Sequence, residues 1–264
     1  MNRLSWTLAT LLAGAPLAAQ AAAPRNKVLN AVGFAQNLDA QAPMDASFRD
    51  ETGKTVRFGD LFQGKPVVLA LVYYKCPMLC TETLNGLVRA LRALSFDAGK
   101  QFNLIAVSFD PRETAGLAAA KKALYVERYG RAGAAHGWSF LTGDEASIRR
   151  LAGAAGFRYA FDQELDQYAH ATGLVVLTPR GRISHYLYGV EYAAGDLRLA
   201  LVEAAAGTIG SPVDQLLLYC YHYDPLTGKY GLLVTRVLRI AGALTVALMA
   251  AWIARLGLRR RSAP

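Results

Sequence analysis

Two cysteines four residues apart, Cys76 and Cys80, are the side chains of this 264-residue chain whose type and spacing most directly indicate chemistry. Cys80 falls at the start of a stretch with helical periodicity, so both sulfur atoms are expected on one side, close enough to hold one ion. The helix N-terminus and the neighbouring Lys75 are expected to favour thiolate, the form that binds metal or attacks a disulfide. Soft thiolates select Cu(I), zinc or an iron–sulfur cluster. The pair therefore predicts a metal site, a redox-active dithiol, or both.

A two-cysteine metal site needs another ligand, and imidazole is the usual supplement. His170 is the best candidate by position, because it precedes an apolar stretch, residues 173–177, that reads as a strand beginning near the cysteine turn. Without the cysteines, a loop histidine with no ligand role would be the better interpretation. His185 alternates with apolar residues on one strand face and is interpreted as a packed histidine. His136 lies in a Gly/Ala-rich loop and is assigned no role.

A structural disulfide between Cys76 and Cys80 is the alternative interpretation of the pair, since an exported protein can form one. A bond between residues four apart closes a very small loop and therefore constrains the unfolded chain little. We favour the metal site, while the two cysteines can still cycle through a disulfide as part of their function.

A second group of ligand-type residues lies closer to the C-terminus. In an extended segment, Cys220, His222 and Asp224 would share one face, which makes them a candidate second metal site or a relay to a partner. The competing interpretation is a juxtamembrane aromatic segment, because the four tyrosines within residues 219–230 suit the headgroup zone of a membrane. We favour this second interpretation.

Apolar runs place the cysteines in a fold. Residues 66–74 and 102–109 are continuous apolar stretches, typical of strands covered on both faces, and the first ends directly at the cysteines. The remaining pattern predicts further strands and helices, at residues 138–141, 173–177 and 182–188 for strands and at residues 80–94, 114–129, 144–155 and 197–206 for helices. A β-α-β-α half followed by a β-β-α half is the order of a thioredoxin-like α/β fold, with the cysteine turn at the carboxyl edge of the sheet.

The two ends of the chain read as targeting and anchoring segments. Residues 1–23 resemble a secretory signal peptide, with Arg3, an apolar core and an A-x-A cleavage site, although an uncleaved anchor is the alternative. Residues 237–258 have the length of a transmembrane helix, and arginines follow directly at 259–261. The positive-inside rule keeps that cluster in the cytoplasm and the main domain outside. We expect an inner-membrane protein of a bacterium, single-pass, with its domain in the periplasm.

These boundaries divide the chain into six parts. Between the signal peptide and the transmembrane helix we expect a flexible lead-in, a thioredoxin-like domain and a juxtamembrane segment, at residues 24–46, 47–210 and 211–236; residues 259–264 form a cytoplasmic tail. The formal charge is +9, but five arginines of the leader and tail supply more than half of it. The remaining positive charge forms no basic run, so a nucleic-acid partner is not expected.

An ordered set of motifs then points to a family. It runs from Asp50–Lys54 through Phe58–Leu61, Gly64–Val68, Cys76–Cys80 and Val107–Pro111 to His170. In this order, over about residues 45–205, the chain resembles the Sco/SenC family of copper chaperones. The resemblance implies a thioredoxin fold that binds one copper, as Cu(I) or Cu(II), through Cys76, Cys80 and His170. It also implies that Asp110, at a family acidic position, orients the site from outside the ligand shell.

The same resemblance implies a function and partners. Family members serve maturation of the dinuclear copper centre of cytochrome c oxidase, by delivering metal or by reducing the cysteines of that centre. The partners would be the oxidase subunit that carries the centre and other copper chaperones. The chain departs from the usual family pattern at Tyr74, Met78 and Ala169, and its expected anchor is C-terminal rather than N-terminal.

Two other functions compete with a copper chaperone that exchanges ligands without turnover. The first is a thiol-disulfide oxidoreductase using Cys76 and Cys80 without metal, although such enzymes usually carry their cysteines two residues apart. The second is a peroxiredoxin-like peroxidase, which is disfavoured because the usual threonine before the cysteine is missing. Metal binding, thiol exchange and peroxide turnover separate the three.

Overall fold

The computed structural model describes residues 32–76, 79–163 and 165–209, and near the C-terminus residues 223–224, 229–230, 239–240, 242–246, 249 and 252. The expected signal peptide and both Cys220 and His222 lie outside the described residues, as does most of the expected helix 237–258. No helix that the described residues form is long and apolar enough to cross a membrane.

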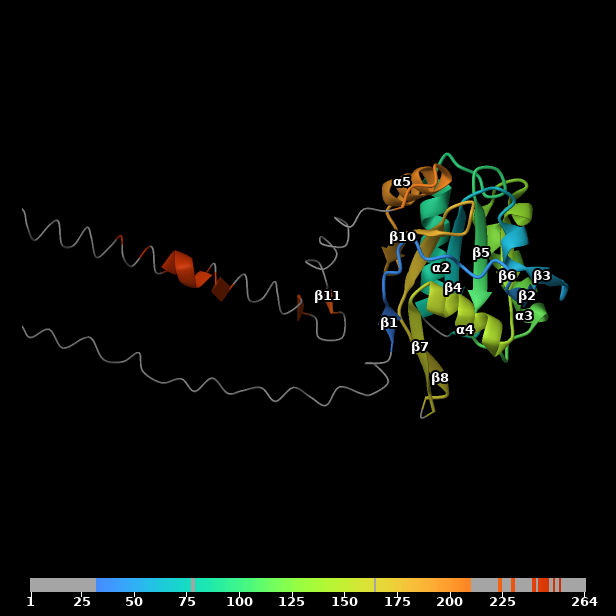
Figure 1. Cartoon of the computed structure of the whole chain (residues 1–264), viewed down its shortest axis with the longest axis horizontal. Coiled ribbons are helices and arrows are strands. Elements are labelled where there is room, and N and C mark those ends of the chain that lie inside the picture. The colour runs from blue at the N-terminus through green and yellow to red at the C-terminus, as the bar shows by residue number, and fades with distance from the viewer. Residues whose placement is uncertain are drawn as a thin grey trace, which may run out of the picture.

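A five-stranded sheet forms the centre of the domain, in the order β10-β9-β4-β5-β6 (Figure 1). Its strands are β4 (Val67–Val72), β5 (Asn103–Ser108), β6 (Trp138–Leu141), β9 (Gly173–Leu177) and β10 (Ile183–Tyr188). The first three run parallel, whereas β9 is antiparallel to both of its neighbours. Every residue of β4, β5 and β9 is buried, which is why these segments are continuous apolar runs in the sequence.

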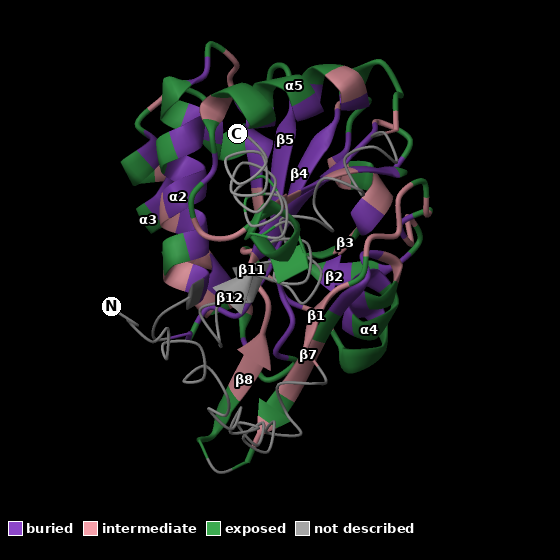
Figure 2. Cartoon of the chain, turned by 90° about the vertical axis from the view of Figure 1, so that its left-hand side faces the viewer, coloured by how far each residue is buried: buried purple, intermediate pink, exposed green. Residues whose placement is uncertain are grey.

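Four α-helices cover the sheet. In Figures 1 and 2, α2 (Leu79–Ala93) and α3 (Ala115–Tyr129) lie on one face and α4 (Glu145–Ala154) on the other. The fourth, α5 (Ala194–Ala205), packs against β10, β9 and α2. The element order and sheet order confirm the expected mixed α/β architecture and agree with a thioredoxin-like fold.

Local sequence signals define where these helices begin and how closely they pack. Thr114 accepts a hydrogen bond from the backbone N–H of Leu117 at the start of α3, and Asp144 accepts one from Ser147 at the start of α4. Asp144 is therefore the N-cap that the sequence predicts. Gly86 lies within α2, where a Cβ would come 1.8 Å from the carbonyl oxygen of Val190. This close approach explains a glycine inside a helix.

The strands β2 (Ser47–Arg49) and β3 (Thr55–Arg57) form a hairpin, followed by a 3₁₀ turn at Phe58–Leu61; a second 3₁₀ turn, Ala134–Gly137, precedes β6. Near the C-terminus, β11 (Tyr223–Asp224) pairs with β12 (Lys229–Tyr230).

A second small sheet differs from the sequence-based expectation. The strands β1 (Gly33–Phe34), β7 (Phe157–Asp162) and β8 (Gln167–His170) form an antiparallel sheet in the order β1-β7-β8, beside the central one. The segment expected as a flexible lead-in, residues 24–46, contributes β1, and its Ala42 and Ala46 are buried. Pairing with β7 and packing against the core order residues 33–46, so the described domain extends N-terminal to residue 47.

Candidate metal centre

The cysteines lie where β4 leaves the sheet and α2 begins, at the carboxyl edge of the parallel strands. Both are buried, with 8% of Cys76 and 2% of Cys80 exposed, and the structure describes both as thiols. The backbone N–H of Cys80 donates to Cys76 Sγ at 3.4 Å, and the N–H of Tyr73 donates to Cys80 Sγ at 3.3 Å. Backbone donors are therefore already directed at both sulfur atoms.

His170 reaches the cysteines from the end of β8 rather than from a loop. Its Nε2 lies 3.3 Å from Cys80 Sγ, and its Nδ1 lies 2.8 Å from the carbonyl oxygen of Ala171. Because a carbonyl oxygen can only accept, Nδ1 carries a hydrogen, and in the neutral imidazole Nε2 then presents its lone pair to the thiols. This is the tautomer and orientation that a metal-ligating histidine needs.

The three predicted ligands are thus brought together, although 90 residues separate Cys80 from His170 in sequence. Their ligand atoms all lie within 4.8 Å of one another. Metal–ligand bonds of about 2.0–2.3 Å span such a spacing with small adjustments. Two sulfur donors and one imidazole form a soft donor set, which suits Cu(I) or zinc better than hard cations.

Aromatic rings surround this group, and its burial changes the pKa of a cysteine. The ring of His170 packs against Tyr73, Phe109 and Phe157 at centroid distances of 5.8, 5.2 and 6.4 Å. Burial, with the adjacent Cys76 thiol as the next cause, raises the pKa of Cys80 well above its ordinary value. The sequence had favoured thiolate at both cysteines, and for Cys80 in the metal-free protein this is wrong, because desolvation outweighs the helix N-terminus. A bound cation would supply the compensating positive charge.

Asp110, which the resemblance places outside the ligand shell, pairs with Arg112 in the structure. The residue is 4% exposed, and its carboxylate accepts hydrogen bonds from the side chain of Arg112 at 2.8 to 3.2 Å. The guanidinium of Arg112 lies over the rings of Phe161 and Tyr168, 4.9 and 5.6 Å from their centroids. Asp110 therefore supports the β7–β8 hairpin, while the carbonyl of Ala171 orients the imidazole of His170.

Sequence reasoning missed Glu113, a buried carboxylate that contacts the backbone directly before Cys76. A usable signal was present. Because β4 and β5 are parallel, the residues that follow them meet at the same edge of the sheet, and Glu113 follows β5 closely.

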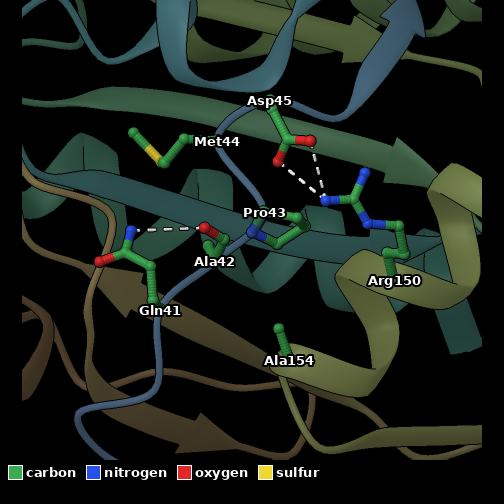
Figure 3. A pocket seen from close by; sticks show the side chains of 7 residues that line it. All are labelled: Gln41, Ala42, Pro43, Met44, Asp45, Arg150 and Ala154. Atoms are coloured by element: carbon green, nitrogen blue, oxygen red, sulfur yellow. Dashed lines mark hydrogen bonds and ion pairs between the residues drawn. The ribbon is translucent and has the colours of Figure 1, made fainter.

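Of the histidines that the structure describes, His136 and His185 take no part in this group. His185 is largely buried and contacts Ser184 and Glu203, which confirms the interpretation as a packed residue. His136 is exposed in a 3₁₀ turn. A hollow of about 570 Å³ lies between residues 41–45 and α4, where Asp45 and Arg150 form an ion pair (Figure 3). None of its lining residues is a predicted ligand.

Comparisons with known proteins agree with this geometry. The SCO1/SenC family model matches residues 36–199. Similar structures include a proposed electron transfer protein from Aquifex aeolicus VF5, which is 27% identical, with 64% of this chain and 95% of that chain covered and a TM-score of 0.57. A SCO1/SenC family lipoprotein from Bacillus anthracis str. Ames is 17% identical, covering 64% and 96%, with a TM-score of 0.50.

A third similar structure is BsSco, described as a member of the Sco family of cytochrome c oxidase assembly proteins with a disulfide switch. It is 20% identical, with 65% of this chain and 98% of that chain covered and a TM-score of 0.50. At such identities the second and third likenesses show the fold alone. No curated protein sequence matches the chain. The family model, which spans more than half of the sequence, decides the assignment: this chain belongs to the SCO1/SenC family.

Proposed function

We propose that this protein binds one copper ion through Cys76, Cys80 and His170 and helps to assemble the dinuclear copper centre of cytochrome c oxidase. The observation that carries the proposal is the convergence of three soft ligand atoms within 4.8 Å from two segments far apart in sequence. Membership of the SCO1/SenC family favours copper over zinc, which the donor set alone also fits.

The residues of the site suit a cargo that must be held and then released. Two thiols that lose their protons on binding match the charge and softness of Cu(I). His170 lies at the partly exposed side of the group, so its bond to copper is the one that an incoming ligand of a partner can replace first. Transfer by stepwise ligand exchange needs no change in the oxidation state of copper.

We propose further that the protein is exported and anchored in the inner membrane, with its copper site in the periplasm. The support is the signal-like segment 1–23, the apolar segment 237–258 and the arginines at 259–261. This location would place the site on the side of the membrane where an exported oxidase subunit acquires its metal.

A titration of the reduced full-length chain with Cu(I), in competition with a chelating indicator, tests the copper site. One tightly bound copper per chain is expected, and none of that affinity in a Cys76→Ser variant. In cells that carry only this variant, the oxidase should lack its dinuclear copper centre, as measured from copper content and the absorption of that centre. A normal centre in those cells would overturn the assembly role.

The dithiol reductase is the second candidate, because Cys76 and Cys80 lie close together as thiols. In that reaction the two thiols form a disulfide, and two electrons and two protons pass to a disulfide of the partner. His170→Ala separates the functions. Loss of copper binding and of oxidase assembly together supports copper delivery, whereas assembly that survives without copper binding supports thiol reduction.

A further inference from the structure

We propose that Glu113 is a positioning residue that holds the backbone before Cys76 in the conformation that copper binding requires. This inference rests on the proposed copper site and extends it to a residue outside the ligand group. It follows from the hydrogen bonds of one buried carboxylate.

Both oxygens of Glu113 accept hydrogen bonds from the segment that leads into the site. Oε2 accepts from the backbone N–H of Tyr74 at 2.7 Å, and Oε1 accepts from the N–H of Lys75 at 2.7 Å. Oε2 also accepts from the hydroxyl of Ser108 at 2.6 Å, which fixes the carboxylate from the end of β5. The residue is 7% exposed. The carboxylate thus joins the segment after β5 to the segment after β4.

Those two amides need such a partner because of where they lie. Residues 73–76 have left β4 and have not yet entered α2, so neither a strand nor a helix pairs the N–H groups of Tyr74 and Lys75. The hydrogen bond from the Tyr74 N–H is buried, so this group would be left unsatisfied without an acceptor, and the hydrogen bond from the Lys75 N–H is partly buried. Two consecutive amides on one carboxylate also restrict the backbone torsions between them, directly before the first ligand.

The side chain of Tyr74 anchors the same segment to the central sheet. Its hydroxyl lies within hydrogen-bond distance of the carbonyl oxygens of Ala106 and Leu141, at 3.0 and 2.9 Å, inside the central sheet. Tyr74 is therefore fixed at its ring, and Glu113 fixes its backbone and that of Lys75. Without Glu113, the chain between this anchor and Cys76 would lose its only described side-chain acceptors at these two amides.

Glu113→Gln is the variant that isolates this role. An amide of the same size keeps one acceptor oxygen, but its NH₂ group then faces a backbone N–H or the Ser108 hydroxyl. We expect Cu(I) affinity of the full chain to fall about 10- to 100-fold with one copper still bound, the usual effect of losing a partner outside the ligand shell. We also expect the metal-free thiols to react faster with iodoacetamide, a readout that needs no copper.

Glu51→Gln is the matched control. Glu51 is another poorly exposed carboxylate; it pairs with Lys122 and accepts from the backbone N–H of Phe140 at 3.4 Å, but it does not hold the segment before Cys76. The Glu51→Gln variant should unfold at a lower urea concentration than wild type, while its copper affinity and the alkylation rate of its thiols should stay unchanged. If Glu113→Gln fails to fold, Glu113→Asp keeps the charge and shortens the reach, and should show the same two effects in smaller measure.

The outcomes separate this inference from the function on which it rests. Wild-type protein that binds no copper contradicts the proposed function, and the alkylation rates then still decide on Glu113. Copper affinity and alkylation rates equal to wild type in the Glu113 variant overturn the inference. Equal losses in the Glu51 and Glu113 variants also overturn it, because they would show a general effect of stability.

Discussion

The proposed metal ligands come from two regions that are held in different ways. The cysteine segment lies between β4 and α2, where Tyr73, Tyr74 and both cysteines are buried, and the buried carboxylate of Glu113 holds its backbone. His170 comes from the β7–β8 hairpin, which extends beyond the central sheet in Figures 1 and 2. That hairpin is half-buried, with 38% of Phe161 and 67% of Leu165 exposed, and ring contacts hold it against the domain.

This difference suggests that the two regions play different parts in holding a metal ion. A region fixed by the core keeps two thiols in place whether or not metal is present. A peripheral hairpin can move with a smaller loss of buried contacts, so under the proposed function His170 is the ligand suited to leave during transfer. Phe109 touches both regions, since its ring packs against Tyr73 of the cysteine segment and against Tyr168 and His170 of the hairpin.

The largest effect is expected from the core region itself. Cys80→Ser keeps the shape of the side chain but replaces a soft sulfur by a hard oxygen, so the full chain should no longer bind copper stoichiometrically. Isothermal titration with Cu(I) under anaerobic conditions measures this. Retained one-to-one binding of undiminished affinity would show that Cys80 is not a ligand.

Phe109→Ala should damage both regions at once. Phe109 is fully buried, and removal of such a ring costs about 3–5 kcal/mol of the free energy of unfolding. Urea unfolding of the metal-free protein measures the loss. Leu199→Ala, at a side chain that is 58% exposed, is the control and should change stability by no more than about 0.5 kcal/mol. Similar stabilities of the two variants would contradict the central place of Phe109.

Copper affinity should fall as pH falls, because binding displaces the proton of Cys80. Burial raises the pKa of this thiol, so the folded metal-free protein holds its proton at neutral pH and above. Each displaced proton weakens apparent affinity about tenfold for each pH unit of acidification, and for the proton of Cys80 the dependence should continue above the ordinary thiol pKa of about 8.5. Competition titrations between pH 6 and pH 9 measure the slope. An affinity independent of pH over this range would show that Cys80 binds as an already ionised group.

The smallest effect is expected in the hairpin. Phe161 packs on Tyr168 at 5.1 Å and under Arg112, contacts worth about 0.5–1.5 kcal/mol. Phe161→Ala should therefore weaken copper binding by roughly 2- to 10-fold without changing the alkylation rate of the cysteines. Leu165→Ala, at the exposed turn of the same hairpin, should change neither quantity. A faster alkylation rate in Phe161→Ala would mean that the two regions are not held independently.

The same contrast explains what the sequence could predict. The strand and helix on either side of Cys76 and Cys80 can be predicted from the local distribution of apolar residues. A strand buried on both faces must be continuously apolar, and a helix must repeat its apolar positions. The ligands themselves were predicted for the same reason. The structure brings His170 to the two cysteines, although its strand was not foreseen.

The hairpin and the buried carboxylate were not predicted, because each depends on partners distant in sequence. Phe157, Tyr159 and Phe161 alternate with polar or small residues, a strand signal that went unused in a short segment. Glu113 lies in a polar run after β5 that resembles an exposed loop, and only the parallel pairing with β4 brings it to the cysteines. Asp110 pairs with Arg112 two residues further along the chain, and only the contact of Arg112 with Phe161 depends on the distant hairpin.

The affinity of the full chain for Cu(I), measured for wild type and His170→Ala by competition with one chelator at one pH, tests most directly that both regions hold one copper. The account predicts one tightly bound copper in wild type and a loss in the variant larger than the roughly 100-fold typical of partners outside the ligand shell. The metal-free variant should remain folded but unfold at a lower urea concentration than wild type, because it loses the ring contacts of His170. Equal affinities of the two proteins would contradict the three-ligand site.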